Sequence, residues 1–276
     1  MGLRLWTPPQ RDSAADGAVE WPAVPVPMPV AAQAPTVIAT TPSSPSRVMP
    51  SLASPVAPLV RAPAAQKFQT STVNAHGMDW PTLRAAVADC RACTLCDSRT
   101  QTVFGVGHQQ AHWLVVGEAP GEQEDLQGEP FVGPSGQLLD RMLAALRLSR
   151  TDDGDRPPAQ RAYIANTLKC RPPRNRNPTA EELAQCEPFL VRQIQLLRPR
   201  IILAMGRFAV QALLRSDEPI GKLRGRVHQY EGVPLVVTYH PAYLLRNLPD
   251  KAKAWEDLCL AADVAERPDR PSADSA

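Results

Sequence analysis

The sequence has no long apolar run. A helix that crosses a bilayer needs about 20 consecutive apolar residues, and no segment of the 276 residues approaches that length. After Arg4 there is also no uninterrupted apolar segment of the kind that a signal peptide requires. We therefore expect a cytoplasmic protein that has no membrane partner.

The net charge is small, and the segment after the first apolar run lacks the usual nucleotide-binding motifs. The formal net charge is only +2 at pH 7, so a nucleic-acid site would have to come from local basic segments and not from the overall field. The segment after Val116 lacks the G-x-G-x-x-G spacing, and no G-K-[ST] follows it. We therefore expect no nucleotide cofactor.

Proline, by contrast, is abundant and unevenly placed. Residues 1–77 hold thirteen of the 30 prolines and show no stable apolar period. This composition predicts a disordered, partly polyproline-II extension, then a folded, monomeric domain over 78–265 and a disordered tail over 266–276. The apolar patch at 3–6 is either a frayed terminus or a peptide that docks on a protein partner.

The folded part alternates short apolar runs with amphipathic segments. Apolar runs typical of strands that are buried on both faces occur at 113–116, 162–166, 201–206 and 235–239. Helical periods are found at 78–89, 135–146, from 178 onward and at 208–214. This alternation predicts an α/β fold, namely a three-layer α/β/α sandwich with a central four-stranded parallel sheet.

Polar side chains stand where three of the predicted strands end. Glu118 follows the first strand, Asn166 ends the second and His240 follows the fourth. Carboxyl ends of parallel strands share one edge of a sheet, so we expect these side chains to converge on one pocket, with Phe131 on the intervening loop. Taken singly, Asn166 and His240 would more often be ordinary turn residues.

Four acids lie within the eight residues 118–125, in a segment that we predict to be a turn. Solvated loop charge together with a helix-starting acid is the ordinary explanation. Glu118, however, comes directly after the glycine that ends a buried strand. This position favours a carboxylate that faces a cleft, where its pKa can be tuned.

Five of the six cysteines have spacings that suit metal ligands. Cys90, Cys93 and Cys96 follow a C-x-x-C-x-x-C pattern, while Cys170 and Cys186 flank an Arg/Pro-rich loop and a short helix. Disulfides are not expected in a cytoplasmic chain. These sulfurs can close a four-thiolate site for either zinc or an iron–sulfur cluster. The alternative is five small, buried hydrophobic side chains.

Several motifs taken together resemble one family. In chain order they are Gly117-Glu-Ala-Pro-Gly121, Pro130-Phe-Val-Gly133, Asn166 with Lys169-Cys-Arg-Pro-Pro173, and His240-Pro-Ala-Tyr-Leu-Leu-Arg246. This set is similar to the type 4 uracil-DNA glycosylases, the iron–sulfur branch of that superfamily, over about residues 78–262. The resemblance implies a [4Fe-4S] cluster held by four of the cysteines: Cys90, Cys93, Cys170 and Cys186. It leaves Cys96 and Cys259 outside the ligand set.

The resemblance also implies a monofunctional DNA glycosylase, which hydrolyses the N-glycosidic bond of uracil and leaves an abasic site for base excision repair. The uracil would be flipped out of the stack, with Phe131 against its face and Asn166 bonded to its O4 and N3–H. His240 would stabilise the departing uracil anion at O2. Glu118 would offset the positive charge on the sugar and position the water, with Glu124 as a second candidate.

Two positions leave parts of this hypothesis open. Ala119, expected beside the base, stands where the type 1 enzymes carry an aspartate, so the water-positioning residue is not fixed. Lys169 is the nearest candidate for a Schiff base, although a charge on a phosphate or beside the cluster is its more ordinary role. The competing hypotheses are a non-catalytic or product-capturing uracil-DNA-binding member of the superfamily, and an iron–sulfur oxidoreductase with a nucleotide cofactor.

Short basic segments would hold the uracil-containing DNA. Three arginines crowd the loop between the last two cysteines of the implied cluster, and we expect them on phosphates: Arg171, Arg174 and Arg176. Leu244 and Leu245 are expected to fill the gap left by the flipped base, with Arg246 on a phosphate. The alternative for the two leucines is packing in the core.

Overall fold

The computed structural model describes residues 74–151 and 155–267, and a six-stranded sheet lies at the centre of this part of the chain. Its strands are β1 (Val106–Gly107), β2 (Trp113–Gly117), β3 (Ala162–Asn166), β4 (Ile201–Met205), β5 (Val227–Tyr230) and β6 (Val233–Thr238). They lie in the order β1-β3-β2-β4-β6-β5. The predicted extension falls outside the described residues except for 74–77, and the predicted tail except for 266 and 267.

The four central strands, β3, β2, β4 and β6, run parallel to their neighbours. They are the four strands that the sequence predicts, and every residue of β2, β3 and β4 is buried. Continuous apolar runs are typical of such doubly covered strands. The register sets Gly117 opposite Asn166, so the last residues of β2 and β3 are neighbours at the carboxyl edge of the sheet.

The sheet has six strands, two more than the four that the sequence predicts. β1 pairs with β3 and β5 pairs with β6, both antiparallel and both at the edges. β1 has only two residues, and β5 alternates exposed with half-buried positions. Neither has the continuous apolar run that identifies a strand buried on both faces, which is why the prediction omits them.

Eight α-helices occur in the described part of the chain. Four were predicted: α1 (Trp80–Ala88), α3 (Pro134–Ala145), α4 (Ala180–Leu197) and α5 (Arg207–Leu214). The others are α2 (Glu122–Gln127), α6 (Ile220–Leu223), α7 (Pro241–Leu244) and α8 (Asp250–Ala265). Single 3-10 turns occur at η1 (Thr94–Asp97), η2 (Pro158–Gln160) and η3 (Pro173–Asn175). Within the described ranges, no helix combines the length and the apolar character that a membrane crossing requires.

α2 corrects the turn that was predicted for the acidic segment. The backbone N–H of Gly121 donates a hydrogen bond to the carboxylate of Glu124 at 3.1 Å, and three acids lie in the first turn of the helix. Carboxylates in this position satisfy free N–H groups and interact favourably with the helix dipole. The acids that suggested a loop therefore stabilise a short helix.

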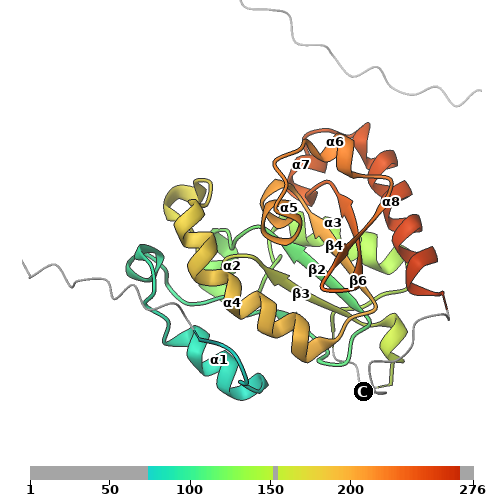
Figure 1. Cartoon of the computed structure of the whole chain (residues 1–276). Coiled ribbons are helices and arrows are strands. Elements are labelled where there is room, and N and C mark those ends of the chain that lie inside the picture. Colours follow the sequence, from blue (N-terminus) through green and yellow to red (C-terminus); the bar gives the residue numbers. More distant parts are fainter. Residues whose placement is uncertain (1–73, 152–154, 268–276) are drawn as a thin grey trace, which may run out of the picture. The chain divides into compact units, whose positions relative to one another are not determined.

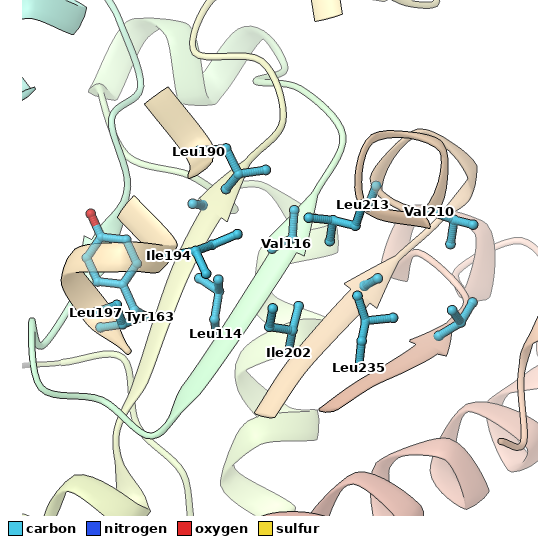
Figure 2. Close-up of a cluster of buried hydrophobic side chains, with 14 of the residues drawn as sticks. Leu114, Val116, Tyr163, Leu190, Ile194, Leu197, Ile202, Val210, Leu213 and Leu235 are labelled. Carbon is cyan, nitrogen blue, oxygen red and sulfur yellow. The ribbon is translucent and has the colours of Figure 1, made fainter. Parts of the chain in front are cut away.

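Helices cover both faces of the sheet, as Figure 1 shows. α4 and α5 lie over one face, where their apolar side chains pack on alternate residues of the central strands. Figure 2 labels members of this cluster: Leu190, Ile194 and Leu197 from α4, Val210 and Leu213 from α5, and Leu114, Val116, Tyr163, Ile202 and Leu235 from the strands. α3 and α8 pack on the opposite face. The three-layer α/β/α sandwich is thus confirmed.

A third apolar cluster joins α1 to α4. Leu83 and Val87 of α1 pack with Phe189 of α4 in a cluster that also contains two buried cysteines and has two half-buried cysteines packed against it. Ala75 is buried in the same cluster, so the segment just before α1 also packs on it. This cluster places the end of α1 beside the first half of α4.

Candidate active site and metal centre

An open cleft of about 820 Å³ lies at the carboxyl edge of the parallel strands. Its walls include the four residues that we expect to converge: Glu118, Phe131, Asn166 and His240. These residues come from the exits of β2, β3 and β6 and from the loop between α2 and α3. Other residues predicted for the site line the same cleft: Ala119, Glu124, Arg176 and Arg246. The structure therefore brings most of the predicted site residues into one place.

Asn166 offers an unused acceptor inside this cleft. The residue is 2% exposed, and its side-chain oxygen Oδ1 has no hydrogen-bond partner among the described residues. A buried acceptor left unsatisfied costs roughly 1–3 kcal/mol, so such an atom in a cleft suggests a ligand that donates to it. Gly117 makes the space: an added Cβ there would lie 2.5 Å from Oδ1 of Asn166 and 2.6 Å from Cζ of Phe131.

Phe131 forms an aromatic wall of the cleft. Its ring stacks on the imidazole of His240, with centroids 5.3 Å apart and planes at 27°. Its φ of 56° lies in the left-handed region, which residues other than glycine rarely adopt. Its carbonyl oxygen fits against Gly136, where an added Cβ would approach to 1.7 Å. The ring is therefore held through an unusual backbone conformation that its surroundings impose.

His240 is a neutral hydrogen-bond donor. The backbone N–H of Ala242 donates to its Nδ1 at 3.2 Å, so the imidazole caps the first turn of α7. Because Nδ1 accepts this bond, the proton of the neutral ring is on Nε2. Burial lowers the pKa of His240 to about 4, against an opposing effect of Glu124. Near pH 7 the ring is uncharged, and its Nε2–H can donate to a ligand.

Glu118 and Glu124 both line the cleft but differ in their partners. Burial raises the pKa of Glu118, and the positive charge of Arg207 opposes this shift. Glu124 accepts hydrogen bonds from three backbone N–H groups, those of Gly121, Val132 and Gly133, at 3.1, 3.0 and 3.2 Å. Its Oε2 thereby holds the backbone at the start of α2, and its Oε1 holds the backbone that follows Phe131. Glu118 remains the better candidate for chemistry.

The other two acids of this segment have structural partners. Asp125 is 2% exposed, and its carboxylate accepts a hydrogen bond from the backbone N–H of Thr100 at 3.0 Å. Glu122 pairs with Arg171 across 3.4 Å near the surface. Three of the four acids therefore have structural partners among the described residues.

The arginines predicted to hold DNA are placed differently from one another. Arg176 donates hydrogen bonds to both carboxylate oxygens of Glu182, so its charge is already paired. Arg171 donates to the side-chain oxygen of Asn175 at 2.8 Å. Arg174 is exposed in η3. These contacts tie the loop together, and of the three arginines only Arg174 has no hydrogen bond or ion pair of its side chain within the described part of the chain.

The predicted leucine wedge needs a correction. Leu244 is 1% exposed, whereas Leu245 is 42% exposed. Leu245 directly follows α7 and keeps helical dihedral angles. One residue along a helix turns the side chain by about 100°, so Leu244 and Leu245 point in different directions. Leu244 packs in the core and does not reach DNA, and only Leu245 remains available for that role.

A second, small cavity is surrounded by sulfur. It is lined by five cysteines: Cys90, Cys93, Cys96, Cys170 and Cys186. The guanidinium of Arg99 donates to Sγ of Cys170 at 3.1 Å, and the backbone N–H of Lys169 donates to Sγ of Cys186 at 3.2 Å. Hydrogen bonds to sulfur are a feature of iron–sulfur sites. Cys259 lies in α8 and does not line this cavity.

The spacing of these sulfurs bears on which metal they suit. No group of three or more His, Cys, Asp or Glu side chains in residues 74–151 and 155–267 is placed to hold a single metal ion. A tetrahedral zinc site needs four ligands within about 2.0–2.3 Å of one point. A cubane takes one thiolate on each of four irons, so its ligands stand further apart. Five cysteines around one small cavity are compatible with the four-thiolate site that the sequence predicts.

Lys169 lies beneath the cleft and not in it. It is 1% exposed, and its Nζ donates to the backbone oxygen of Asn166 at 2.8 Å and to Oε1 of Gln193 at 2.6 Å. Its side chain borders the cysteine cavity. An amine in this position reaches neither a DNA phosphate nor a sugar in the cleft. This excludes the Schiff base and the phosphate contact for Lys169 and leaves its role as a positive charge beside the cysteines.

The cleft is also lined by residues that the sequence analysis does not single out, among them Arg207, Tyr239 and Tyr243. The two tyrosine rings stack with centroids 5.0 Å apart and planes at 21°. Arg207 begins α5 directly after the glycine that follows β4, and Tyr239 directly follows β6. Examining the residues at every strand exit, and not only the obvious polar ones, would have identified Arg207 and Tyr239.

Comparison with known proteins agrees with this geometry. Residues 104–259 match the family model of the Uracil DNA glycosylase superfamily. A type-4 uracil-DNA glycosylase of Archaeoglobus fulgidus is 43% identical over 167 residues, which is 58% of this chain and 79% of that protein. That of Saccharolobus solfataricus is 41% identical over 180 residues, 62% of this chain and 79% of that protein. That of Pyrobaculum aerophilum is 38% identical over 191 residues, 66% of this chain and 93% of that protein.

Proposed function

Because the chain belongs to the uracil DNA glycosylase superfamily and, within it, to the type-4 uracil-DNA glycosylases, we propose that its cleft excises uracil from DNA. The reaction is hydrolysis of the N-glycosidic bond, which leaves an abasic site for base excision repair. The base must leave the helical stack to enter a cleft of this kind. Uracil-containing DNA is therefore the partner, and no nucleotide cofactor takes part.

The unpartnered Oδ1 of Asn166 is the observation that carries this proposal. Uracil offers a donor at N3 and an acceptor at O4, and an amide side chain complements both. Cytosine offers an unprotonated acceptor at N3 and a donor at N4, so in this orientation of the amide it would leave the buried oxygen unsatisfied, and discrimination requires that the amide does not flip. Phe131 would lie against the face of the base, and Ala119 would line the pocket beside it. The pocket thus supports selection of uracil over cytosine.

His240 would stabilise the leaving group. Breaking the N-glycosidic bond builds negative charge on uracil, and a neutral imidazole that keeps its proton on Nε2 can donate to O2 as this charge develops. Because the donor is uncharged and already oriented by its bond from Ala242, it needs no reorganisation in the transition state. Removing one such donor typically slows catalysis by about 100- to 1000-fold.

Glu118 would act on the sugar side of the reaction. Its carboxylate can offset the positive charge that forms on the sugar and can hold the attacking water. Ala119 has no carboxylate to do this, and the oxygens of Glu124 are occupied by backbone N–H groups. We therefore assign water positioning to Glu118 and a supporting role to Glu124. With Lys169 buried below the cleft, no Schiff base is needed, and the enzyme is monofunctional.

The cysteine cavity supports a [4Fe-4S] cluster held by Cys90, Cys93, Cys170 and Cys186. When bound, such a cluster supplies a covalent link between segments that are far apart in the sequence. The thiolates connect the end of α1 to α4 and hold the loop that carries Arg171 and Arg174. The residues thereby present a fixed basic surface to DNA phosphates, with Arg176 reinforcing the loop.

The remaining DNA contacts belong to the segment after His240. Leu245 is exposed and would fill the gap left by the flipped base, while Arg246 lines the cleft and would contact a phosphate. Residues 1–73 of the proposed extension over 1–77, its docking patch at 3–6 and residues 268–276 of the proposed tail over 266–276 lie outside the described residues. We propose that the domain works as a monomer, because its own cleft already holds the residues assigned to base reading, leaving-group stabilisation and water positioning.

A glycosylase assay tests this function directly. The purified full-length protein is incubated with a single-stranded oligonucleotide that contains one uracil, and the product is treated with alkali. We expect the strand to break at the uracil position only after alkali is added. A matched oligonucleotide with thymine in place of uracil should stay intact. Strand breaks before alkali would contradict a monofunctional enzyme, and intact uracil would contradict the proposed function.

Replacing the base-reading residue provides the matching variant. Asn166→Asp removes the amide donor and sets a carboxylate beside O4, a loss of at least about 2–3 kcal/mol for an unmet buried polar group. Single-turnover uracil excision should fall by roughly 100-fold or more. A rate within about threefold of wild type, under 1 kcal/mol, would mean that Asn166 does not read the base.

A further inference from the structure

Arg150 holds the loop that presents Phe131, although it does not line the cleft itself. Its Nη1 donates to the backbone oxygen of Pro130 at 2.7 Å, and its Nη2 donates to the backbone oxygen of Phe131 at 2.8 Å. The same Nη2 donates to Oδ2 of Asp140 at 2.7 Å. The Arg150 side chain is 16% exposed, against 45% for Asp140. Arg150 therefore lies behind the wall of the cleft, anchored to α3.

These bonds fix the conformation of one residue. The carbonyl of Pro130 belongs to the peptide plane that precedes the Cα of Phe131, and the carbonyl of Phe131 belongs to the plane that follows it. A rigid guanidinium that bonds to both carbonyls restrains both planes, and so restrains φ and ψ of Phe131. This restraint acts where it is needed, because φ of Phe131 is 56° and the left-handed region is unfavourable for a bulky side chain.

The rest of the loop is held from the other direction. The carboxylate of Glu124 accepts the N–H groups of Val132 and Gly133, directly after Phe131. The carboxylate of Glu124 therefore holds the N–H groups of this loop, and the guanidinium of Arg150 holds its carbonyl groups. The two side chains restrain the backbone on both sides of Phe131. No helix or strand fixes Phe131, which lies between α2 and α3. These two charged side chains take over that role.

We propose that Arg150, anchored by Asp140, is a positioning residue for uracil excision, because it keeps Phe131 in the left-handed conformation that sets the ring against the base. This inference rests on the proposed function. Lysine could not replace arginine fully, because a single ammonium lacks the planar pair of donors that reaches both carbonyls. Without Arg150 the backbone of Phe131 would relax toward more common φ and ψ values. The ring would then move away and no longer stack on the base.

The first test follows the ring and does not depend on activity. The full-length protein, which has five phenylalanines, is produced with 4-fluorophenylalanine, and the fluorine resonance absent from Phe131→Leu is assigned to Phe131. In Arg150→Met this resonance should shift or broaden while the others keep their positions. Arg147→Met removes the charge of an exposed arginine on the same segment and should leave the spectrum unchanged. An unmoved Phe131 resonance in Arg150→Met would overturn the proposal.

The second test asks whether Arg150 acts through Phe131. Phe131→Leu should slow single-turnover uracil excision by about 100-fold and Arg150→Met by about tenfold. If one acts through the other, the double variant should stay within about threefold of Phe131→Leu. A double variant slower by the product of the two factors, about 1000-fold, would show independent effects and refute the inference. If Arg150→Met does not fold, Asp140→Asn takes its place. It should slow uracil excision less than Arg150→Met, and it should cause no further slowing when combined with Phe131→Leu.

The two tests separate this inference from the proposed function. A wild-type protein without uracil excision would remove the function, yet the fluorine spectrum would still decide whether Arg150 positions Phe131. Normal wild-type excision with an independent effect of Arg150 would remove only the inference. Arg150→Lys should recover part of the lost rate and part of the original Phe131 resonance, since it can still reach one carbonyl.

Discussion

Gly117 determines whether the base-reading amide and the aromatic ring can share one pocket. A Cβ at this position would lie 2.5 Å from Oδ1 of Asn166 and 2.6 Å from the Phe131 ring, so Gly117→Ala must displace at least one of them. A displacement of about 1 Å in a catalytic site can cost roughly 100-fold. We therefore expect single-turnover uracil excision by Gly117→Ala to fall by about 100-fold.

A second glycine of the cleft serves as the matched control. An added Cβ at Gly221 meets nothing closer than the hydroxyl of Tyr239 at 4.0 Å. Gly221→Ala should therefore excise uracil within about threefold of wild type, a change under 1 kcal/mol. Equal losses in both variants would show that an extra methyl group in the cleft, and not displacement of Asn166 or Phe131, is responsible.

The protonation state of His240 predicts how excision depends on pH. Burial lowers its pKa to about 4, so the neutral donor is fully present from about pH 5 upward. The contribution of His240 to the single-turnover rate should stay constant as pH rises through about 6.5, the ordinary pKa of histidine. A rate that falls across this range in wild type, but not in His240→Gln, would identify the imidazolium as the active species.

The same shift predicts an effect on stability. Between about pH 6.5 and 4 the imidazole would be protonated in the unfolded chain but stays neutral in the folded protein. The unfolded state then binds more protons, so the free energy of unfolding should fall as pH decreases through this window, by at most about 3 kcal/mol. Urea titrations should show a smaller decrease for His240→Gln. Identical slopes would mean that His240 is protonated in the folded state.

At the scale of single elements, α4 links the metal centre to the core. Its N-terminus is closed by a capping box in which Thr179 and Glu182 exchange hydrogen bonds with the backbone N–H groups of each other. Arg176 pairs with the same glutamate, and Cys186 lies two turns further along the helix. The cap therefore stabilises the turns that lead to a proposed cluster ligand.

Loss of this cap should weaken the fold without affecting the cleft. Thr179→Ala removes the side-chain acceptor at the helix start and should lower the free energy of unfolding by about 1 kcal/mol. For a domain of this size that corresponds to a decrease in Tm of about 2–4 °C. Thr179→Ser keeps the hydroxyl and should behave as wild type in the same thermal scan. Equal stability of the alanine and serine variants would rule out the cap.

At the scale of the whole molecule, the proposed cluster connects segments that are otherwise distant in sequence. Cys186→Ala should lose iron and sulfide, which are expected at about four each per chain in anaerobically purified protein. Cys259→Ala, outside the cavity, should retain both. Cys96 lines the cavity, and we expect Cys96→Ala to retain the cluster as well, because the family resemblance implies the other four ligands. Stoichiometric zinc without iron in the wild type would exclude the cluster.

The sequence by itself determined the central architecture and the place of the cleft. Four continuous apolar runs identified β2, β3, β4 and β6, because strands buried on both faces have no polar side to interrupt the pattern. Parallel strands bring their carboxyl ends to one edge, which is why Glu118, Asn166 and His240 could be grouped without coordinates. The C-x-x-C-x-x-C spacing of Cys90, Cys93 and Cys96 is likewise a local property of the chain.

Only the tertiary structure decided the contacts that depend on distant partners. Whether Glu124 or Glu118 keeps a free carboxylate depends on N–H groups brought in from the loop around Phe131. The opposite burial of Leu244 and Leu245 depends on how α7 is rotated against the core, and Arg150 reaches Phe131 across nineteen residues of sequence. The edge strands β1 and β5 could not be predicted from the sequence either, because their residues are half-buried or exposed and form no continuous apolar run. Side-chain partners come from packing in three dimensions, which residue types and spacings do not encode locally.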